Sequence, residues 1–319
     1  MNDTAFLKFI AIALILNSHC DPFYPIKAFA TGGTIGLSLF FGLSSFGLLL
    51  SERKKPRGFH EWYGRRIKRI YPSVWVLLII VYLPIKVLTG GLRGADTFSV
   101  FGMFFYPPFW FLQSLMIFYF LGFFIIKNYH RKKLHYFTFA SMALYLIGYL
   151  YYLNLSEYSI ESLPFRAIFY FLIFLFGIFL GTKSNKIIFS GPSDFLALVF
   201  FISLTYVHKY LMTKNSFMSL QIIQHLLMFP SLYYFLKLAR SDFVNNRIMQ
   251  LPPISNIITY ISSLTLELFM VNVTISPVIC TLNLPFPMNV IIFMVLTFVM
   301  AALLHYVSAC LSESIVKFS

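Results

Sequence analysis

Hydrophobic stretches of about membrane-spanning length follow one another along nearly the whole chain, and they restrict what it can fold into. A helix that crosses the hydrocarbon core of a bilayer needs about 20 predominantly apolar residues. Ten stretches reach or approach that length, at residues 4–20, 29–50, 72–89, 100–126, 135–153, 165–182, 194–212, 217–237, 257–281 and 287–311. We therefore predict an all-α integral membrane protein, a bundle of about ten transmembrane helices forming one domain over residues 1–319.

The composition supports this prediction. Hydrophobic residues make up 59% of the 319 residues and charged residues only 11%, whereas a soluble domain carries about 25% charged residues. The loops between the apolar stretches are short, so we expect no appended soluble domain. Asn17-Ser18-His19-Cys20 is a poor cleavage site, so we expect no signal peptide either. The bundle itself must carry the function.

The basic residues predict the orientation in the membrane. With the N-terminus in the cytoplasm, eighteen of the 25 Lys and Arg residues fall in cytoplasmic loops and six in outer loops. Cytoplasmic loops of membrane proteins are enriched in these residues, and an even number of spans returns the C-terminus inside. Both termini are therefore predicted to be cytoplasmic. The net charge of +14 then reflects topology and attraction to anionic lipid, and we expect no nucleic-acid partner.

Two ionisable residues, Lys8 and His19, stand in the first apolar stretch. Eleven residues make about three helical turns, so both side chains leave one face of a helix, roughly 16 Å apart. Ionisable groups inside an apolar span are expensive and favour a functional interpretation. The alternatives are that Lys8 reaches back to the cytoplasmic interface and that His19 is an ordinary interfacial histidine.

Basic residues are concentrated in the predicted cytoplasmic loop Phe59–Pro72. Arg66 and Arg69 are three residues apart and would share a face of a helix. Two guanidiniums on one face can bind a phosphate-bearing ligand, or they can hold lipid headgroups. The three cysteines and seven histidines show no metal-ligand or disulfide spacing, so we expect no metal.

Taken together, four motifs resemble those of the acyltransferase-3 family of bacterial membrane O-acyltransferases. Lys8 and His19 match that family's Arg/Lys-x10-His motif, and Gly36–Gly47 is similar to its glycine- and phenylalanine-rich second helix. Phe59–Pro72 matches its Arg-x-x-Arg segment, and Trp110–Tyr119 resembles its Trp-Phe-Leu segment. The resemblance covers residues 5–120 closely.

The resemblance implies a reaction and a location. Members of the family have about ten core helices and acylate sugar hydroxyls of cell-surface polysaccharides, commonly with acetyl groups from acetyl-CoA. We therefore expect a bacterial inner-membrane O-acyltransferase. Its partners would be acyl-CoA as donor, a glycan acceptor such as an O-antigen, capsule or exopolysaccharide unit, and the lipid bilayer.

The chemistry assigns roles to the candidate residues. Transfer to a hydroxyl needs a base, and histidine suits this role because its usual pKa lies near neutrality. His19 is the candidate base, and neighbouring Asp21 could orient its ring. Lys8 lies toward the cytoplasmic side from which CoA would enter. Arg66 and Arg69, with Arg65 beside them, suit the CoA phosphates.

Other polar residues stay open to several interpretations. Ser44 and Ser45 are candidate acyl carriers, and Ser45 stands where the family usually has glycine. Trp110 fits an aromatic-belt anchor and a site-lining residue equally. Glu267 could be a catalytic carboxylate, face an aqueous cavity, or pair with a basic residue, and the last is favoured. Asn272 replaces a histidine of the family.

An exporter of polysaccharide or of lipid-linked sugar is the alternative function. Such a transporter would predict internal repeats or helices broken by glycine and proline, and the sequence shows neither clearly.

Overall fold

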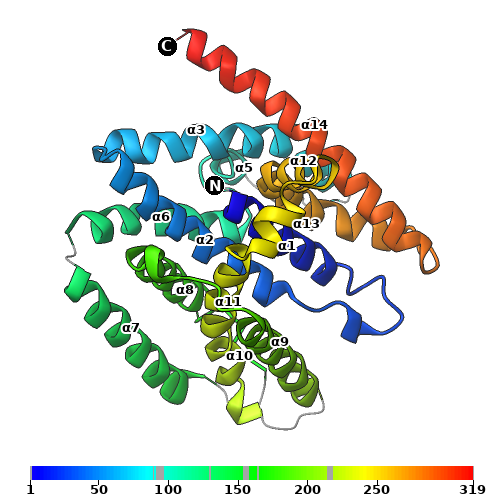
Figure 1. The fold of residues 1–319 in the computed structure, drawn as a ribbon. Helices are drawn as coiled ribbons and strands as arrows, with labels where there is room; N and C mark the ends of the chain where they lie inside the picture. Colours follow the sequence, from blue (N-terminus) through cyan, green and yellow to red (C-terminus); the bar gives the residue numbers. More distant parts are fainter. Residues whose placement is uncertain are drawn as a thin grey trace. The chain divides into compact units, whose positions relative to one another are not determined.

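The computed structural model describes residues 2–88, 90, 97–128, 131–153, 158–163, 165–213 and 218–318. Within these ranges the chain forms helices, turns and loops, and no residue belongs to a strand (Figure 1). The all-α prediction is therefore confirmed. In the described parts, seven helices are long and apolar enough to cross a membrane. An eighth span results if α12 and α13, which are bent by 64° relative to one another, count as one.

Helices occupy all ten of the predicted apolar stretches. They are α1 (Asn2–Ser18), α2 (Gly33–Lys54), α3 (Phe59–Leu77), α4 (Leu83–Leu88), α5 (Thr97–Gly102), α6 (Trp110–Asn128), α7 (Arg131–Tyr152), α8 (Phe165–Thr182), α9 (Pro192–Thr213), α10 (Ile222–Leu226), α11 (Met228–Ala239), α12 (Pro252–Ser263), α13 (Thr265–Thr281) and α14 (Met288–Phe318). Two of the ten predicted stretches, occupied by α1 and α7, are not among these seven apolar helices. α1 is apolar but short, and α7 begins with three basic residues and carries five tyrosines, which lower its hydropathy.

The basic segment Phe59–Pro72, which the sequence analysis placed between two apolar stretches, is helical. It forms most of α3, which continues through a π-helical turn (Leu78–Tyr82) into α4. The segment is amphipathic, because Trp62 and Ile70 are buried while Lys68 and Arg69 are exposed. The apolar face is what holds these charged residues in a helix against the protein.

The chain divides into two compact units, and each is assembled from three separate segments. Unit 1 comprises Met1–Leu14, Thr31–Pro56 and Phe118–Ser262. Unit 2 comprises Ile15–Ala30, Arg57–Ile117 and Ser263–Ser319.

In unit 1, small residues allow α2 and α8 to approach closely. A methyl group added to Gly177 would collide with the Ser45 hydroxyl and the Gly42 carbonyl oxygen. Small residues at helix contacts are how membrane helices bring their backbones together. At the end of the same contact, Arg53 Nη1 donates a hydrogen bond to Gly181 O at 3.0 Å. The α2–α8 pair is therefore the packing core of unit 1.

Charged side chains of unit 1 are paired across helices; Glu52, Asp194 and Lys237 are buried, and Lys127 is exposed. Lys237 of α11 lies 2.6 Å from Asp194 of α9, and Lys127 of α6 lies 2.6 Å from Glu52 of α2. A charge inside an apolar bundle is tolerated when it is paired. The pairs join α9 to α11 and α2 to α6.

A second polar group in unit 1 surrounds Glu161, in the connection between α7 and α8. Thr34 Oγ1 donates to Glu161 Oε1 at 3.2 Å, and His225 Nε2 lies 3.9 Å from the same oxygen. His225 is fully buried and its Nδ1 lies 2.5 Å from the Tyr145 hydroxyl. Burial by itself raises the pKa of Glu161. His225, Arg166 and Thr34 outweigh that effect and hold this pKa below its usual value of 4.5.

In unit 2, α14 packs against α13 and α3, and α13 runs beside α14 in Figure 1. The ring centroids of Phe111 in α6 and Phe269 in α13 lie 4.2 Å apart. Tyr71 and Trp75 of α3 donate hydrogen bonds to the carbonyl oxygens of Phe105 and Phe104, at 2.8 and 2.9 Å. The segment before α6 is thereby fastened to α3.

Candidate active site

His19 follows directly after α1, the helix that the first apolar stretch predicted. Its backbone N–H lies 3.2 Å from Ile15 O and 3.1 Å from Leu16 O, so the helical turn continues through it. The imidazole is half-buried. Asp21 is half-buried as well, but no hydrogen bond or ion pair joins the described side chains of His19 and Asp21. The orienting role of Asp21 therefore stays a prediction.

The segment after His19 is fixed to the beginning of α14. Asn289 Nδ2 donates to Phe23 O at 3.1 Å, and the rings of Phe23 and Phe293 lie 5.1 Å apart. Closer to the histidine, the Tyr24 hydroxyl donates to Asn17 Oδ1 at 2.9 Å. These contacts give the chain around His19 a defined position within unit 2.

Most of the candidate residues belong to unit 2. Seven lie there: His19, Asp21, Arg65, Arg66, Arg69, Trp110 and Glu267. Lys8, Ser44 and Ser45 belong to unit 1. Lys8 and Ser44 are half-buried. Ser45 is fully buried and its hydroxyl donates to Gly42 O at 3.0 Å, as part of the α2–α8 contact.

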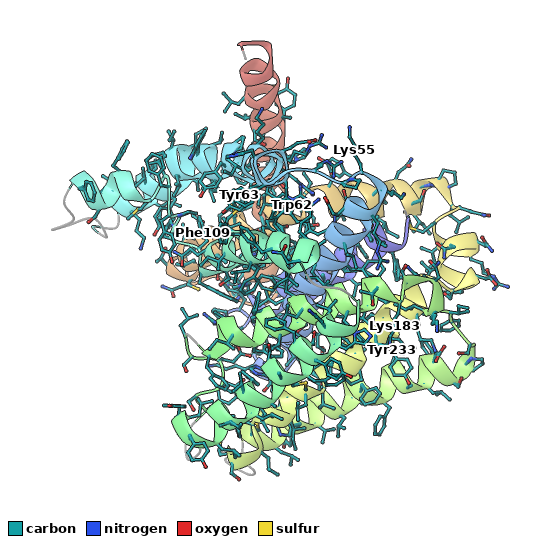
Figure 2. All side chains as sticks on the ribbon, turned by 90° about the vertical axis from the view of Figure 1, so that its left-hand side faces the viewer. Lys55, Trp62, Tyr63, Phe109, Lys183 and Tyr233 are labelled. Atoms are coloured by element: carbon teal, nitrogen blue, oxygen red, sulfur yellow. The ribbon has the colours of Figure 1, made fainter. Side chains whose placement is uncertain are left out.

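The arginines of α3 differ in what they already contact. Arg65 Nη2 lies 2.7 Å from Glu61, which also lies 3.3 Å from Arg57. Arg66 lies over the ring of Trp62, with its Cζ 4.4 Å from the ring centre, and Nη1 donates to Trp62 O at 3.0 Å. Trp62 is labelled in Figure 2. Because Glu61 neutralises part of the charge at Arg57 and Arg65, the excess positive charge lies further along α3.

That excess is carried by Arg66, Lys68 and Arg69. Arg69 is exposed and Arg66 is half-buried. Residues three apart are neighbours on a helix surface, so the Arg66 and Arg69 guanidiniums can approach one phosphate group together. Trp62 holds Arg66 in place in advance, which lowers the entropy cost of binding an anion.

Trp110 begins α6 and is half-buried, and its ring centroid lies 6.4 Å from that of Phe111.

Asn272, at the position of the family's histidine, is fully buried, and its Nδ2 donates a hydrogen bond to Leu268 O at 2.9 Å. Asn272 therefore supplies its amide to its own helix and no titrating group.

Glu267 pairs with a histidine that the sequence reasoning missed. His305 of α14 has Nδ1 3.2 Å from Glu267 Oε1. The signal was present, because His305 is an ionisable residue in the last apolar stretch, the same feature that selected Lys8 and His19.

No group of three or more His, Cys, Asp or Glu residues in the described ranges is placed to hold a metal ion. An open cavity of about 350 Å³ lies in unit 1, and its polar lining includes Glu52, Arg53, Lys127 and Thr182. It contains none of the candidate residues.

Comparison with known proteins found a family model that matches most of the chain. The fold and the family together define a multi-pass membrane acyltransferase. The family described as "Acyltransferase domain", which is the acyltransferase-3 family, matches residues 5–306, and the chain belongs to it. No curated protein and no solved structure matched the chain. The resemblance read from four motifs is thereby confirmed, and the match runs through segments of both units.

Proposed function

We propose that the chain transfers an acetyl group from acetyl-CoA to a hydroxyl of a cell-surface polysaccharide or of a lipid-linked sugar. His19 takes the hydroxyl proton as general base, and Arg66 and Arg69 hold the CoA phosphates. The observation that carries the proposal is which candidate side chains unit 2 contains. One compact unit contains the histidine after α1, the two arginines of α3 and the polar residues of α13.

The proposed chemistry follows from those side chains. An imidazole can accept a proton from a sugar hydroxyl near neutral pH. Paired guanidiniums bind phosphate oxygens through charge-assisted hydrogen bonds. We assign Arg65 a smaller part than Arg66 and Arg69, because its Nη2 lies 2.7 Å from Glu61.

The proposal includes a topology. Ten helical segments cross the bacterial inner membrane, with α1, α7 and the bent α12–α13 pair added to the seven apolar spans. Both termini are cytoplasmic. The arginines of α3 then face the cytosol, which holds acetyl-CoA, and His19 lies near the outer face, where the glycan is presented.

The test is a mass comparison of surface polysaccharide from three strains. One strain carries the wild-type chain, one its His19→Ala variant, and one lacks the chain. We expect the acetyl mass on the glycan only in the wild-type strain, with polymer still exported in all three and both proteins present in the membrane at equal amounts.

The alternative outcomes lead to different conclusions. Normal acetylation in the His19→Ala strain would remove His19 as the base. Acetylated polysaccharide in the strain that lacks the chain would refute the proposed acceptor. Loss of polymer without loss of acetylation would favour export.

A further inference from the structure

The chain turns back on itself directly after His19. The backbone N–H groups of Phe23 and Tyr24 donate to Cys20 O, at 2.9 and 3.1 Å. His19 and Asp21 lie on this turn, and because they are two residues apart their Cα atoms are separated by no more than about 7 Å. Both side chains are half-buried, and neither has a hydrogen-bond or ion-pair partner among the residues that the structure describes. The turn therefore presents an imidazole and a carboxylate that no described group of the protein engages.

Three aromatic rings cluster on the segments around this turn. The ring centroid of Tyr24 lies 6.3 Å from that of Phe29, edge to face, and 6.2 Å from that of Phe286. Phe29 is 61% exposed and Phe286 is 52% exposed. All three residues belong to unit 2, as do His19 and Asp21. The aromatic cluster of Tyr24, Phe29 and Phe286 therefore offers open ring surface close to the two polar side chains.

Two asparagine side chains hold this part of unit 2 in place. Asn17 Nδ2 donates to Phe29 O at 2.7 Å, and Asn17 Oδ1 accepts from the Tyr24 hydroxyl at 2.9 Å. Asn289, at the start of α14, donates from Nδ2 to Phe23 O at 3.1 Å. A surface that is fixed in advance loses less conformational entropy when it binds a ligand. The aromatic cluster is therefore preorganised.

The charged residues of this segment favour a water-accessible position. Lys27 is exposed and stands between Tyr24 and Phe29 in the sequence, and Asp21 precedes all three. Charged side chains are costly in the hydrocarbon core of a bilayer, so we expect this segment at the level of the headgroups or of water. Aromatic rings at that level can anchor a helix bundle in the interface, or they can bind a ligand. An interfacial anchor needs no carboxylate beside it, so Asp21 favours the ligand.

A sugar ring has the chemistry that these groups recognise. One face of such a ring carries mainly C–H groups, whose positively polarised hydrogens are attracted to the negative face of an aromatic ring. Its hydroxyls donate hydrogen bonds, and a carboxylate oxygen accepts them. Binding sites for small molecules are mainly apolar and contain a few polar groups that fix the orientation of the ligand. Asp21 and the aromatic cluster meet this description.

We propose that Asp21 and the aromatic cluster form the acceptor subsite, which holds a sugar ring with its reacting hydroxyl toward His19. The inference rests on the proposed function and deepens it. Asp21 accepts a hydrogen bond from a second hydroxyl of the same ring, while Phe29 and Phe286 contact its C–H face. Asp21 is then a positioning residue for the acceptor. The acceptor sugar carries a further free hydroxyl near the one that is acylated.

The test measures acetyl transfer by the purified full chain. The varied acceptor is unacetylated glycan prepared from the strain that lacks the chain. The variants are Asp21→Ala, Asp21→Asn, Phe29→Ala and Phe286→Ala. Asp242→Ala and Phe139→Ala are matched controls, because Asp242 is exposed, Phe139 is 66% exposed, and both belong to unit 1.

The expected effect is on binding of the acceptor. Asp21→Ala should raise KM for the glycan roughly tenfold, because a hydrogen bond to a charged group is lost. Asp21→Asn keeps an oxygen that accepts hydrogen bonds and should recover part of this loss. Phe29→Ala and Phe286→Ala should each raise KM for the glycan by roughly fivefold. In all four variants kcat and KM for acetyl-CoA should stay near the wild-type values, and both controls should match the wild type.

Three results would overturn the inference while wild-type transfer stands. One is an unchanged KM for the glycan in Asp21→Ala. Another is a reduced kcat in Asp21→Ala with that KM unchanged, which would return Asp21 to orienting His19. The third is a KM in Phe29→Ala and Phe286→Ala equal to that of Phe139→Ala, which would make the aromatic cluster an interfacial anchor.

Calorimetry of glycan binding without acetyl-CoA separates this inference from the proposed function. A chain that transfers no acetyl group, but binds the glycan more tightly than its Asp21→Ala and Phe29→Ala variants do, would overturn the proposed function and leave the sugar site in place. A wild-type chain that neither binds nor acetylates the glycan would overturn both.

Discussion

Removing the two arginines of α3 should weaken acetyl-CoA binding without slowing the chemical step. Arg66 and Arg69 lie far along the donor from the reacting carbonyl, so they hold the ground state and the transition state equally. Loss of such uniform binding raises KM and leaves kcat nearly unchanged. The variants are Arg66→Ala, Arg69→Ala and the double change.

The structure sets different magnitudes for the two positions. Arg66 is half-buried and held over Trp62 at 4.4 Å, so its hydrogen bonds to a phosphate are worth about 2 kcal/mol, or roughly 30-fold in KM. Arg69 is exposed, and solvent screening reduces its contribution to about 1 kcal/mol, or roughly fivefold. If the two act independently, the double variant should raise KM by roughly 150-fold.

The assay is acetyl transfer in inverted membrane vesicles with acetyl-CoA titrated outside. Lys68→Ala is the control, because Lys68 is exposed on the same helix and its loss changes the net charge equally. Acetyl-dephospho-CoA, which lacks the 3′-phosphate, shows which phosphate the arginines bind. If they bind the 3′-phosphate, the double variant will lose its preference for acetyl-CoA. A double-variant KM equal to that of Lys68→Ala would refute the reasoning and return both arginines to lipid anchoring.

Three further predictions follow from the described geometry. His19→Ala should lower transfer by about 100-fold or more with normal membrane abundance, and activity near that of the wild type would exclude it as the base. Gly177→Ala should destabilise the protein by about 1–3 kcal/mol, because the added methyl meets Ser45 and the α2 backbone. Gly47→Ala should not destabilise the protein, because the added methyl meets nothing within 4 Å. Heat inactivation in detergent compares the stability of the two variants. Glu161 has a lowered pKa, so its stabilising effect is present above pH 4.5 and is lost as the pH falls through the folded value. Glu161→Gln should therefore reduce the difference in heat stability between pH 7 and pH 4, and an unchanged difference would contradict this.

The sequence predicted the class of fold because apolar length is a local property. A run such as Phe165–Thr182 has few alternatives to a helix in a membrane, and α8 occupies the same residues. The segment Phe59–Pro72 was predicted as a cytoplasmic connection in which Arg66 and Arg69 share a helical face. Its charge kept it out of the apolar stretches, and its buried Trp62 and Ile70 make it an amphipathic helix.

The candidate site was harder to predict because its contacts are long-range. The pairing of Glu267 with His305 spans 38 residues, and that of Glu267 with Ser73 spans 194. Spacing along one helix identified Lys8 and His19, but no such spacing connects α3, α13 and α14. Sequence proximity gives no pairing of this kind either: Asp21 stands two residues from His19, and no hydrogen bond or ion pair joins their described side chains.

The order of synthesis gives unit 2 a particular assembly problem. Its first two segments, Ile15–Ala30 and Arg57–Ile117, leave the ribosome early, whereas Ser263–Ser319 comes last. Until α13 and α14 are inserted, Ser73 lacks its carboxylate partner, and the chain around Phe23 lacks Asn289. The first helices of unit 2 must therefore remain in the bilayer without their later partners while most of unit 1 is synthesised. A chain truncated before α14 would contain Arg66, Arg69 and His19. It would lack the helix that contacts both α3 and the segment after His19.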